Sequence, residues 1–371
     1  MKGLILSLLI SIGFMPVFGQ YRFTLDISTK TLSNKDIILN IFNNLDYFPI
    51  KVDTLFIKNG HRIISGEVKQ PSNFAALYVS HKGKYLDVNF VLDSGKNNII
   101  LELPEGASKF LTLKSDARGN FIFNDLNNLF MQTAARYKKP TRVNGYLKIP
   151  ADLTDQIRKL QLKRLETYPN DFGSLIYLYR ISREDSKPGS AKSNLQTLAK
   201  FSDGLKNSEL GKQLYEEETS LIKNKIAATA GNQVKSFTIP EINDNIFSNS
   251  SLIGQPYVIV FSATWCGPCQ LQLPKLKSLY DTYKEKGLKV VYFNDDDDIA
   301  LWKKHVSKNN LTWINVSEKL KPSVSKIPKS FGVYAIPTCL VIDKQGTIVY
   351  NSDQTDPGIN HIENYIKMVL E

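Results

Sequence analysis

The pattern of apolar and polar positions divides the chain into three stretches, and the first of them predicts strands. Between about residues 20 and 115, apolar residues alternate with polar ones over short runs, as they do in half-buried strands. The expected strands cover residues 23–27, 37–41, 52–57, 63–68, 74–79, 86–92 and 99–103. Many short strands at regular spacing predict an all-β module, a small antiparallel sandwich or barrel.

The second stretch, from about residue 116 to 229, has the period of helices. Apolar residues there recur every three or four positions, which places them on one face of a helix. The faces are marked by Leu153, Ile157 and Leu160, by Phe172, Leu175 and Tyr179, by Leu195, Leu198, Phe201 and Leu205, and by Leu210, Leu214 and Leu221. Lys187-Pro188-Gly189-Ser190 predicts a loop between two of these helices. We interpret the stretch as a helical spacer.

In the third stretch, from residue 230 to 371, strands and helices alternate. The expected strands are 257–261, 289–293, 312–316, 338–342 and 347–350, and the expected helices are 266–286, 299–307 and 358–370. Asp343-Lys344-Gln345-Gly346 predicts the turn of a final hairpin. This order predicts an α/β domain with a mixed sheet and helices on both faces.

Composition narrows the class of protein. A chain of 371 residues with 42% apolar and 22% charged residues is that of a globular protein with more than one domain. The net charge of +11 would suit a nucleic-acid partner. The lysines are interleaved with acids along the chain and form no basic tract, so we expect no nucleic-acid binding.

The first residues predict export. Lys2 precedes an apolar stretch over residues 4–14, and the small residue Gly19 follows Pro16, the order of a secretory signal peptide. The stretch is shorter than a membrane-spanning helix. We therefore expect a signal peptide over residues 1–19 and a soluble periplasmic protein. The alternative is an uncleaved N-terminus that anchors the chain in the membrane.

Cysteine usage points to redox chemistry. The chain has three cysteines, of which Cys266 and Cys269 form a Cys-x-x-Cys between an expected buried strand and an expected helix. A helix N-terminus favours the thiolate over the thiol. A structural zinc site would need further ligands at fixed spacing, which are missing here, so we expect no metal. Cys339 lies in an expected core strand, and we interpret it as a buried thiol, with a third redox thiol as the alternative.

The spacing of the pair predicts a role for each residue. Cys266, exposed at the helix N-terminus, is expected to attack a client disulfide, and Cys269, shielded one turn later, to resolve the mixed disulfide. Gly267 and Pro268 shape the turn between the sulfurs, where Pro268 has no N–H to donate. Trp265 offers a flat apolar surface beside them.

Further polar residues have plainer interpretations. We interpret the acidic run Asp295–Asp298 as solvated residues at a helix start, with a cation site as the alternative. His305 falls off the apolar face of its expected helix and is expected to be solvated. His61 and His81 lie in polar turns, and we expect both to be surface residues.

The chemistry-bearing residues resemble those of a known family. Trp265-Cys266-Gly267-Pro268-Cys269 resembles the thioredoxin active site, with Pro274 at the position of that family's helix kink, and Ala335-Ile336-Pro337-Thr338 resembles its cis-proline loop. Residues 331–346 resemble the exported thioredoxin-like branch that contains the TlpA and ResA proteins. Residues 21–115 resemble the domain of unknown function DUF4369.

The resemblance implies a thioredoxin fold over residues 230–371 and a thiol–disulfide oxidoreductase. It implies that Pro337 is cis and that the backbone of Ile336 pairs with an extended client segment. We expect no cofactor, because the redox-active disulfide Cys266–Cys269 carries the electrons itself. Two positions depart from the family's pattern: Val260 stands where thioredoxin has a buried aspartate, and Gln272 stands where the exported branch often has a glutamate. We therefore expect resolution by Cys269 to be slow, or to use water or a group of the partner.

These observations predict a periplasmic enzyme that reduces protein disulfides. Thioredoxin, with the same Cys-Gly-Pro-Cys, has a potential of about −270 mV, against about −120 mV for the oxidant DsbA. The expected partners are client proteins with disulfides or dithiols and a membrane or periplasmic electron donor. The alternatives are a disulfide oxidase or isomerase, and an envelope binding protein whose thiol chemistry is secondary.

Overall fold

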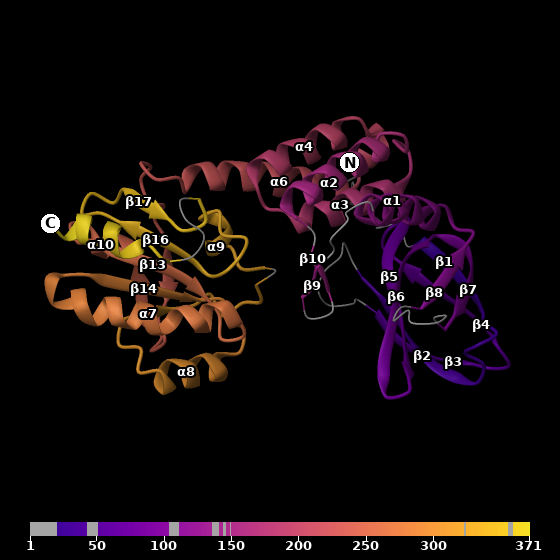
Figure 1. Cartoon of the computed structure of the whole chain (residues 1–371), viewed down its shortest axis with the longest axis horizontal. Helices are drawn as coiled ribbons and strands as arrows, with labels where there is room; N and C mark the ends of the chain where they lie inside the picture. Colours follow the sequence, from indigo (N-terminus) through magenta and orange to yellow (C-terminus); the bar gives the residue numbers. More distant parts are fainter. Residues whose placement is uncertain are drawn as a thin grey trace, which may run out of the picture. The chain divides into compact units, whose positions relative to one another are not determined.

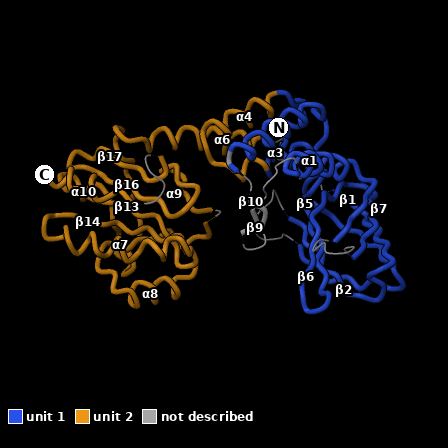
Figure 2. Tube along the Cα trace, in the orientation of Figure 1, with its two compact units in different colours: residues 1–180, 200–210 blue, residues 181–199, 211–371 orange. Residues whose placement is uncertain are grey.

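The computed structural model describes residues 21–42, 51–103, 111–135, 141–143, 146–148, 150–322, 324–354 and 359–371. The expected signal peptide lies outside the described residues. Two compact units make up the chain (Figure 2): residues 1–180 with 200–210, and residues 181–199 with 211–371. The three domains expected from the sequence stay a prediction. Among the described residues, no helix combines the length and the apolar character that a membrane span needs.

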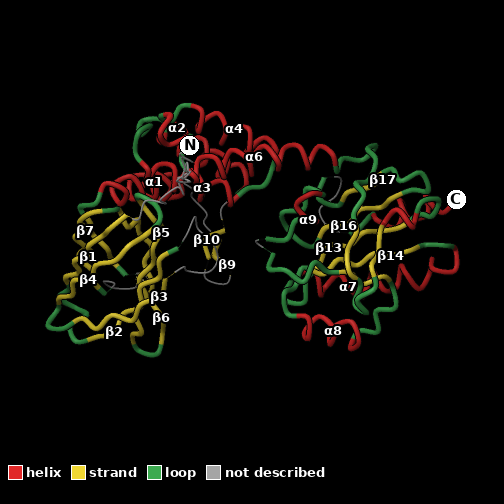
Figure 3. The backbone as a smooth tube through the Cα atoms, turned by 180° about the vertical axis from the view of Figure 1, so that it is seen from behind, coloured by secondary structure: helices red, strands yellow, loops and turns green. Residues whose placement is uncertain are grey.

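The first unit contains the all-β module that the alternating pattern predicts (Figure 3). One four-stranded sheet has the order β4-β1-β7-β8 and the other has the order β3-β2-β5-β6. The strands are β1 (Tyr21–Ser28), β2 (Lys35–Ile41), β3 (Lys51–Ile57), β4 (His61–Val68), β5 (Ser72–His81), β6 (Lys84–Asp93), β7 (Gly95–Glu102) and β8 (Thr112–Ser115). The inward-facing residues of both sheets share one apolar core.

Two details of this module differ from the expectation of a purely antiparallel arrangement. Strand β1 pairs with β7 in parallel, and β8 was not expected. Strands β7 and β8 belong to the same sheet as β1, and the β1–β7 pair joins strands that are far apart in the chain. Alternation along a strand predicts which face is buried, but it does not predict which distant strand lies beside it.

Helices follow the β module, as their period predicts. They are α1 (Arg118–Ala135), α2 (Ala151–Leu165), α3 (Phe172–Glu184), α4 (Pro188–Ala199), α5 (Asp203–Lys206) and α6 (Glu209–Ala227), with the short strands β9 (Thr141–Val143) and β10 (Tyr146–Lys148) between α1 and α2. The expected loop between two helices is confirmed, but it covers residues 185–187 and not 187–190, because α4 begins at Pro188. Proline suits the first helical position, where its missing N–H would have no partner.

The second unit contains a five-stranded sheet of order β15-β14-β13-β16-β17 (Figure 1). Its strands are β13 (Tyr257–Ser262), β14 (Lys289–Asn294), β15 (Ile314–Val316), β16 (Thr338–Ile342) and β17 (Ile348–Asn351). The helices of this region are α7 (Gly267–Tyr283), α8 (Ile299–Lys308), α9 (Ile327–Ser330) and α10 (Ile362–Leu370). A hairpin of β11 (Thr238–Pro240) and β12 (Ile246–Ser248) precedes them. The first three strands of the sheet are parallel, and β16 and β17 are antiparallel additions. This is the predicted thioredoxin fold.

Strand β13 lies at the centre of this sheet, and all six of its residues are buried. Val258 and Val260 pack on one face with residues of α7 and α10, including Leu273 and Ile366. Its alternate residues pack on the other face with Phe237, Phe331 and their neighbours. A strand covered on both faces has an unbroken apolar sequence, which is why this strand could be predicted from its run of apolar residues. It carries the chain directly to the Cys-x-x-Cys.

Candidate redox site

Cys266 and Cys269 form a disulfide with an S–S distance of 2.00 Å. Cys266 is the N-cap of α7, and its Sγ accepts a hydrogen bond from the backbone N–H of Cys269 at 3.2 Å. Pro268 occupies the first turn, where no intrahelical acceptor exists for an N–H. In the reduced protein, an amide aimed at Cys266 Sγ and the positive end of the helix dipole would stabilise a thiolate there. The sequence-based placement of the pair is confirmed.

Access to the pair differs from the expectation. Cys266 is 5% exposed and Cys269 is 3% exposed, whereas Trp265 is 60% exposed. The expectation of an exposed Cys266 is wrong for the disulfide form, because Ala263 and Ile336 pack against both cysteines. Ala263 and, in the cis-proline loop, Ile336 therefore shield the sulfurs, while the Trp265 side chain stays open to solvent.

The cis-proline loop reaches the disulfide from a distant part of the sequence. The Ile336–Pro337 peptide bond is cis, as the resemblance implies. The carbonyl oxygen of Ile336 lies 3.8 Å from Cys266 Sγ. Pro274 lies inside α7, as expected, and a Cβ at Gly267 would meet nothing within 4 Å. Packing therefore does not explain the glycine at position 267.

The segment between β13 and the disulfide is held by a residue that the sequence analysis assigned to solvent. Asp296 is 4% exposed. Its two carboxylate oxygens accept hydrogen bonds from the backbone N–H of Thr264 at 2.9 Å and from Thr264 Oγ1 at 2.8 Å. Ala263 O accepts two more, from Cys266 N and Gln270 Nε2. Ala263 and Thr264 are therefore held by hydrogen bonds with the side chains of Gln270 in α7 and of Asp296, which follows β14.

The acidic run thus has three different environments. Asp298 is the N-cap of α8 and accepts from Leu301 N at 2.9 Å, and Asp297 is exposed, so the helix-start interpretation is confirmed for these two. It is wrong for Asp296. The burial of Asp296 could have been expected from the fold. Asp296 follows β14 and Thr264 follows the adjacent parallel strand β13, and the carboxyl ends of adjacent parallel strands meet at one edge of a sheet, where functional sites form. No cluster of metal-ligating side chains occurs among the described residues.

Asp295 is only partly exposed, and its burial raises its pKa to about 6. The carboxylates of Glu318 and Asp296 act in the same direction, while the nearby Ser325 hydroxyl and the charge of Lys329 oppose the shift. His305 is half-buried and burial lowers its pKa. The expectation of a solvated histidine is therefore wrong at position 305.

Two other histidines lie in the β module. His61 Nε2 lies 2.8 Å from an Asp26 oxygen with its side chain half exposed, which confirms a surface position. His81 is only partly exposed, so the surface interpretation holds for it only in part.

Val260 and Gln272, the two positions that depart from the family's pattern, supply no carboxylate near the disulfide. Val260 is buried and pairs across the sheet with Cys339. The buried Oε1 atom of Gln272 has no hydrogen-bond partner among the described residues. Cys339 is fully buried and burial raises the pKa of its thiol to about 12, which confirms the prediction of a buried thiol and makes a thiolate at this position costly.

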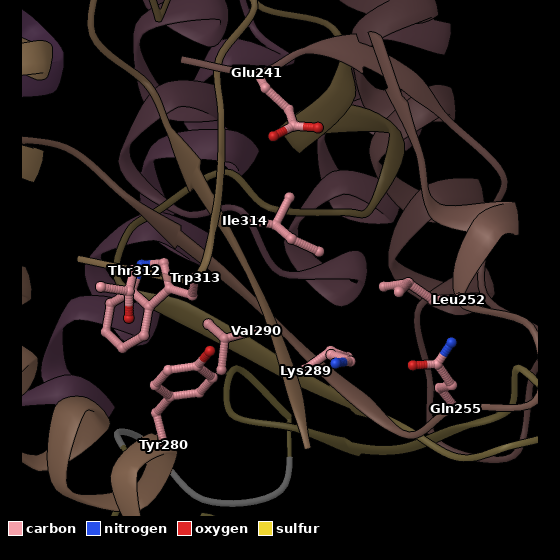
Figure 4. Close-up of a pocket in the computed structure, with 9 residues that line it drawn as sticks. All are labelled: Glu241, Leu252, Gln255, Tyr280, Lys289, Val290, Thr312, Trp313 and Ile314. Atoms are coloured by element: carbon pink, nitrogen blue, oxygen red, sulfur yellow. The ribbon is translucent and has the colours of Figure 1, made fainter. Parts of the chain in front are cut away.

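A separate hollow of roughly 510 Å³ opens at the other end of β14. Figure 4 shows its lining side chains, among them Lys289, Tyr280, Trp313 and Glu241. Lys289 begins β14, whereas the disulfide follows the carboxyl end of the neighbouring strand β13. The hollow therefore belongs to the opposite edge of the sheet and is not part of the redox site.

Comparisons with known proteins agree with this geometry. A thioredoxin-like family model matches residues 254–348. The thiol-disulfide oxidoreductase ResA of Bacillus anthracis is 30% identical over 142 residues, which are 38% of this chain and 78% of that protein. The ResA of Halalkalibacterium halodurans is 24% identical over 142 residues, with the same shares of 38% and 78%.

A solved structure, the thioredoxin domain of a thiol-disulfide oxidoreductase from Bacteroides vulgatus, is 20% identical with a TM-score of 0.35, and the match covers 38% of this chain and 99% of that one. The match to the Bacillus protein spans most of that protein's length. Together with the Cys-x-x-Cys at the start of α7, it shows that this chain belongs to the ResA-like family of thioredoxin-like thiol–disulfide oxidoreductases.

Proposed function

We propose that this protein is an exported thiol–disulfide oxidoreductase that reduces disulfides of client proteins in the periplasm. The observation that carries the proposal is the position of Cys266 at the N-terminus of α7, where Cys269 N–H points at its sulfur and Ile336 O lies 3.8 Å away. Export is supported by the sequence of residues 1–19, in which Lys2 precedes an apolar stretch and a small residue.

In the proposed reaction, the reduced pair gives two electrons to a client disulfide. The thiolate of Cys266 attacks one client sulfur, so that a Cys266–client S–S bond forms and the client disulfide breaks. The displaced client thiolate takes up a proton. The thiolate of Cys269 then attacks Cys266 Sγ, which forms the Cys266–Cys269 disulfide and releases the second client thiolate. A periplasmic or membrane dithiol returns the pair to the reduced state.

The direction of this reaction is proposed from the Cys-Gly-Pro-Cys sequence, which thioredoxin shares. Thioredoxin operates at about −270 mV and the oxidant DsbA at about −120 mV. Gly267 and Pro268, the residues between the two cysteines, therefore favour a reductase. Trp265, which is 60% exposed, would offer an apolar contact beside the sulfurs to an approaching client.

Trapping of mixed disulfides tests this proposal. Cys269→Ser leaves the attacking thiol and removes the resolving one, so we expect adducts of Cys266 with client proteins to accumulate in periplasmic fractions. Cys266→Ser is the matched control and should trap none. If Cys269→Ser forms no adducts while the full chain still captures a partner, the protein is a binding protein and the proposal is wrong.

A further inference from the structure

We propose that the last two turns of helix α6 position the cis-proline loop, residues 332–337, for the binding of client proteins. The inference rests on the proposed reduction of protein disulfides. It assigns a role in the reaction to residues Asn224 and Lys225, which lie in the stretch that the sequence analysis interpreted as a spacer. We call these two residues, with Gly332, Tyr334 and Asp353, the α6 clamp. In Figure 1, α6 runs toward the part of the second unit that contains β17 and α9.

Gly332 is the closest point of approach in the clamp. It has a φ of +65°, and a Cβ built there would lie 2.9 Å from Lys225 Cα and 3.0 Å from Asn224 O. Both contacts are with backbone atoms of α6, which cannot rotate away as a side chain can. Only glycine combines this positive φ with so close an approach. The start of the loop is therefore pressed directly against the α6 backbone.

Lys225 adds a charged contact in a buried place. It is 8% exposed, its Nζ forms an ion pair with Asp353, and the same atom lies 5.9 Å from the centroid of the Tyr334 ring. Gln354 Nε2 donates to Lys225 O at 2.9 Å. A buried charge that loses its partner is strongly destabilised, so Lys225 and Asp353 hold α6 and the segment after β17 in one arrangement.

Tyr334 contacts α6 from the middle of the cis-proline loop. Its hydroxyl lies near the polar side chain of Asn224, which opposes the rise that burial causes in the pKa of Tyr334, and its ring faces the Lys225 ammonium. Two residues later, Ile336 O lies 3.8 Å from Cys266 Sγ. With α6 contacts at positions 332 and 334, the loop has little freedom to move Ile336 relative to the disulfide. The clamp residues thus act as positioning residues, through Ile336 and Pro337.

The position of the cis-proline loop should affect the reaction with protein disulfides. An extended client segment that pairs with the backbone of Ile336 needs that backbone at a fixed distance from Cys266 Sγ. A misplacement of about 1 Å can lower a rate by about a hundredfold. A small disulfide that needs no backbone pairing would be less sensitive. We therefore expect the clamp to set the rate with protein disulfides more than the rate with small ones.

Single-turnover kinetics of the pre-reduced full chain test the inference. The oxidants are insulin, a protein disulfide, and the small aromatic disulfide DTNB. Lys225→Met is expected to lower the second-order rate constant with insulin about tenfold, and Gly332→Ala more than that, while the DTNB rate changes by less than about threefold. Lys223→Met, an exposed position on the same helix, is the matched control and should react with both disulfides at the wild-type rate.

Because Gly332→Ala can prevent folding, Tyr334→Phe supplies a milder change. It removes only the hydroxyl that lies near the Asn224 side chain, and we expect about a threefold loss with insulin alone. Wild-type insulin rates in the folded Lys225→Met and Tyr334→Phe variants overturn the inference, as does an equal loss with insulin and DTNB. If the wild-type protein reduces neither disulfide, the proposed reductase function itself is wrong and the inference falls with it.

Discussion

Two loops meet at the disulfide, and they are held in different ways. The segment before Cys266 is fixed from within the sheet by Asp296, which follows β14 and accepts both polar hydrogens of Thr264. The cis-proline loop is fixed by helix α6, which precedes the whole sheet in the sequence, through the backbone approach at Gly332 and the ion pair of Lys225 with Asp353.

The difference separates two tasks of a thiol–disulfide oxidoreductase. The Asp296 contacts fix the residue two positions before the attacking sulfur, so they should affect the reaction with every disulfide. The α6 clamp fixes the residues proposed to bind a client backbone, so it should affect only clients that need that pairing. Variants of each loop can therefore distinguish control of sulfur chemistry from control of client binding.

Removal of the Asp296 carboxylate should have the largest effect. Asp296→Ala leaves the Thr264 N–H and hydroxyl without their acceptors, and we expect a loss of about 3 kcal/mol in the free energy of unfolding. The rates with insulin and DTNB should fall by the same factor. Urea unfolding and single-turnover kinetics measure the two effects. Asp297→Ala, at an exposed neighbour, should change neither, and a loss with insulin alone would contradict the separation of tasks.

A smaller change to the same loop is Thr264→Val. The substitution keeps the shape of the side chain and the backbone bond to Asp296, and removes only the hydroxyl bond of 2.8 Å. We expect a loss of about 1.5 kcal/mol in the free energy of unfolding, because the acceptor is a carboxylate. Urea unfolding checks this value against Asp296→Ala. A loss as large as that of the alanine variant would mean that the backbone bond contributes nothing.

Asp295 offers a pH-dependent test at the same edge of the sheet. Its folded-state pKa of about 6 lies above the ordinary aspartate pKa of 3.8, so the folded protein binds more protons than the unfolded chain between these values. This group therefore makes stability fall as the pH rises from about 4 to 6, and the cost persists above that. Asp295→Asn removes the charge in a side chain of nearly the same size, and the Ser325 hydroxyl keeps its hydrogen bond to Glu318 Oε2 at 2.6 Å.

We expect Asp295→Asn to raise the free energy of unfolding by about 1 kcal/mol at pH 8, a value reduced for the partial exposure of the side chain, and by almost nothing at pH 4. Denaturant titrations of both proteins across this range give the difference. A variant that is equally destabilised at both pH values would show that the charge of Asp295 does not set its effect on stability.

The smallest redox effect is expected from Cys339. Its burial and raised pKa make it unreactive, so the oxidised native protein should show no thiol that reacts with DTNB until it is unfolded. Cys339→Ala should leave the reduction potential of the disulfide unchanged while costing about 1 kcal/mol of stability for the lost packing. Rapid labelling of Cys339 in the native state would contradict this account.

The two loops also mark what the sequence could predict. The unbroken apolar run of β13, the Cys-Gly-Pro-Cys that follows it and the Ile336–Pro337 motif are local signals, and the fold and the position of the disulfide followed from them. The strands of the β module followed from alternation in the same way. The apolar residues that recur along each of these elements are the ones that become buried, so a short window of sequence is enough to predict the element and its buried face.

The remaining features depend on contacts between distant segments. Nothing near Asp296 in the sequence indicates that Thr264 would lie beside it, and the glycine at position 332 is explained only by the α6 backbone against it. The burial of Cys266 likewise comes in part from Ile336, far along the chain. Register and packing between elements decide these features, and a single sequence leaves both open.

The reduction potential of the Cys266–Cys269 couple in the full chain is the most direct test of the proposed reductase. Equilibration in glutathione or dithiothreitol redox buffers, with the thiols then counted by alkylation, measures it. The account predicts a potential near that of thioredoxin, about −270 mV. A value near that of DsbA, about −120 mV, would contradict it and assign the protein to disulfide formation instead.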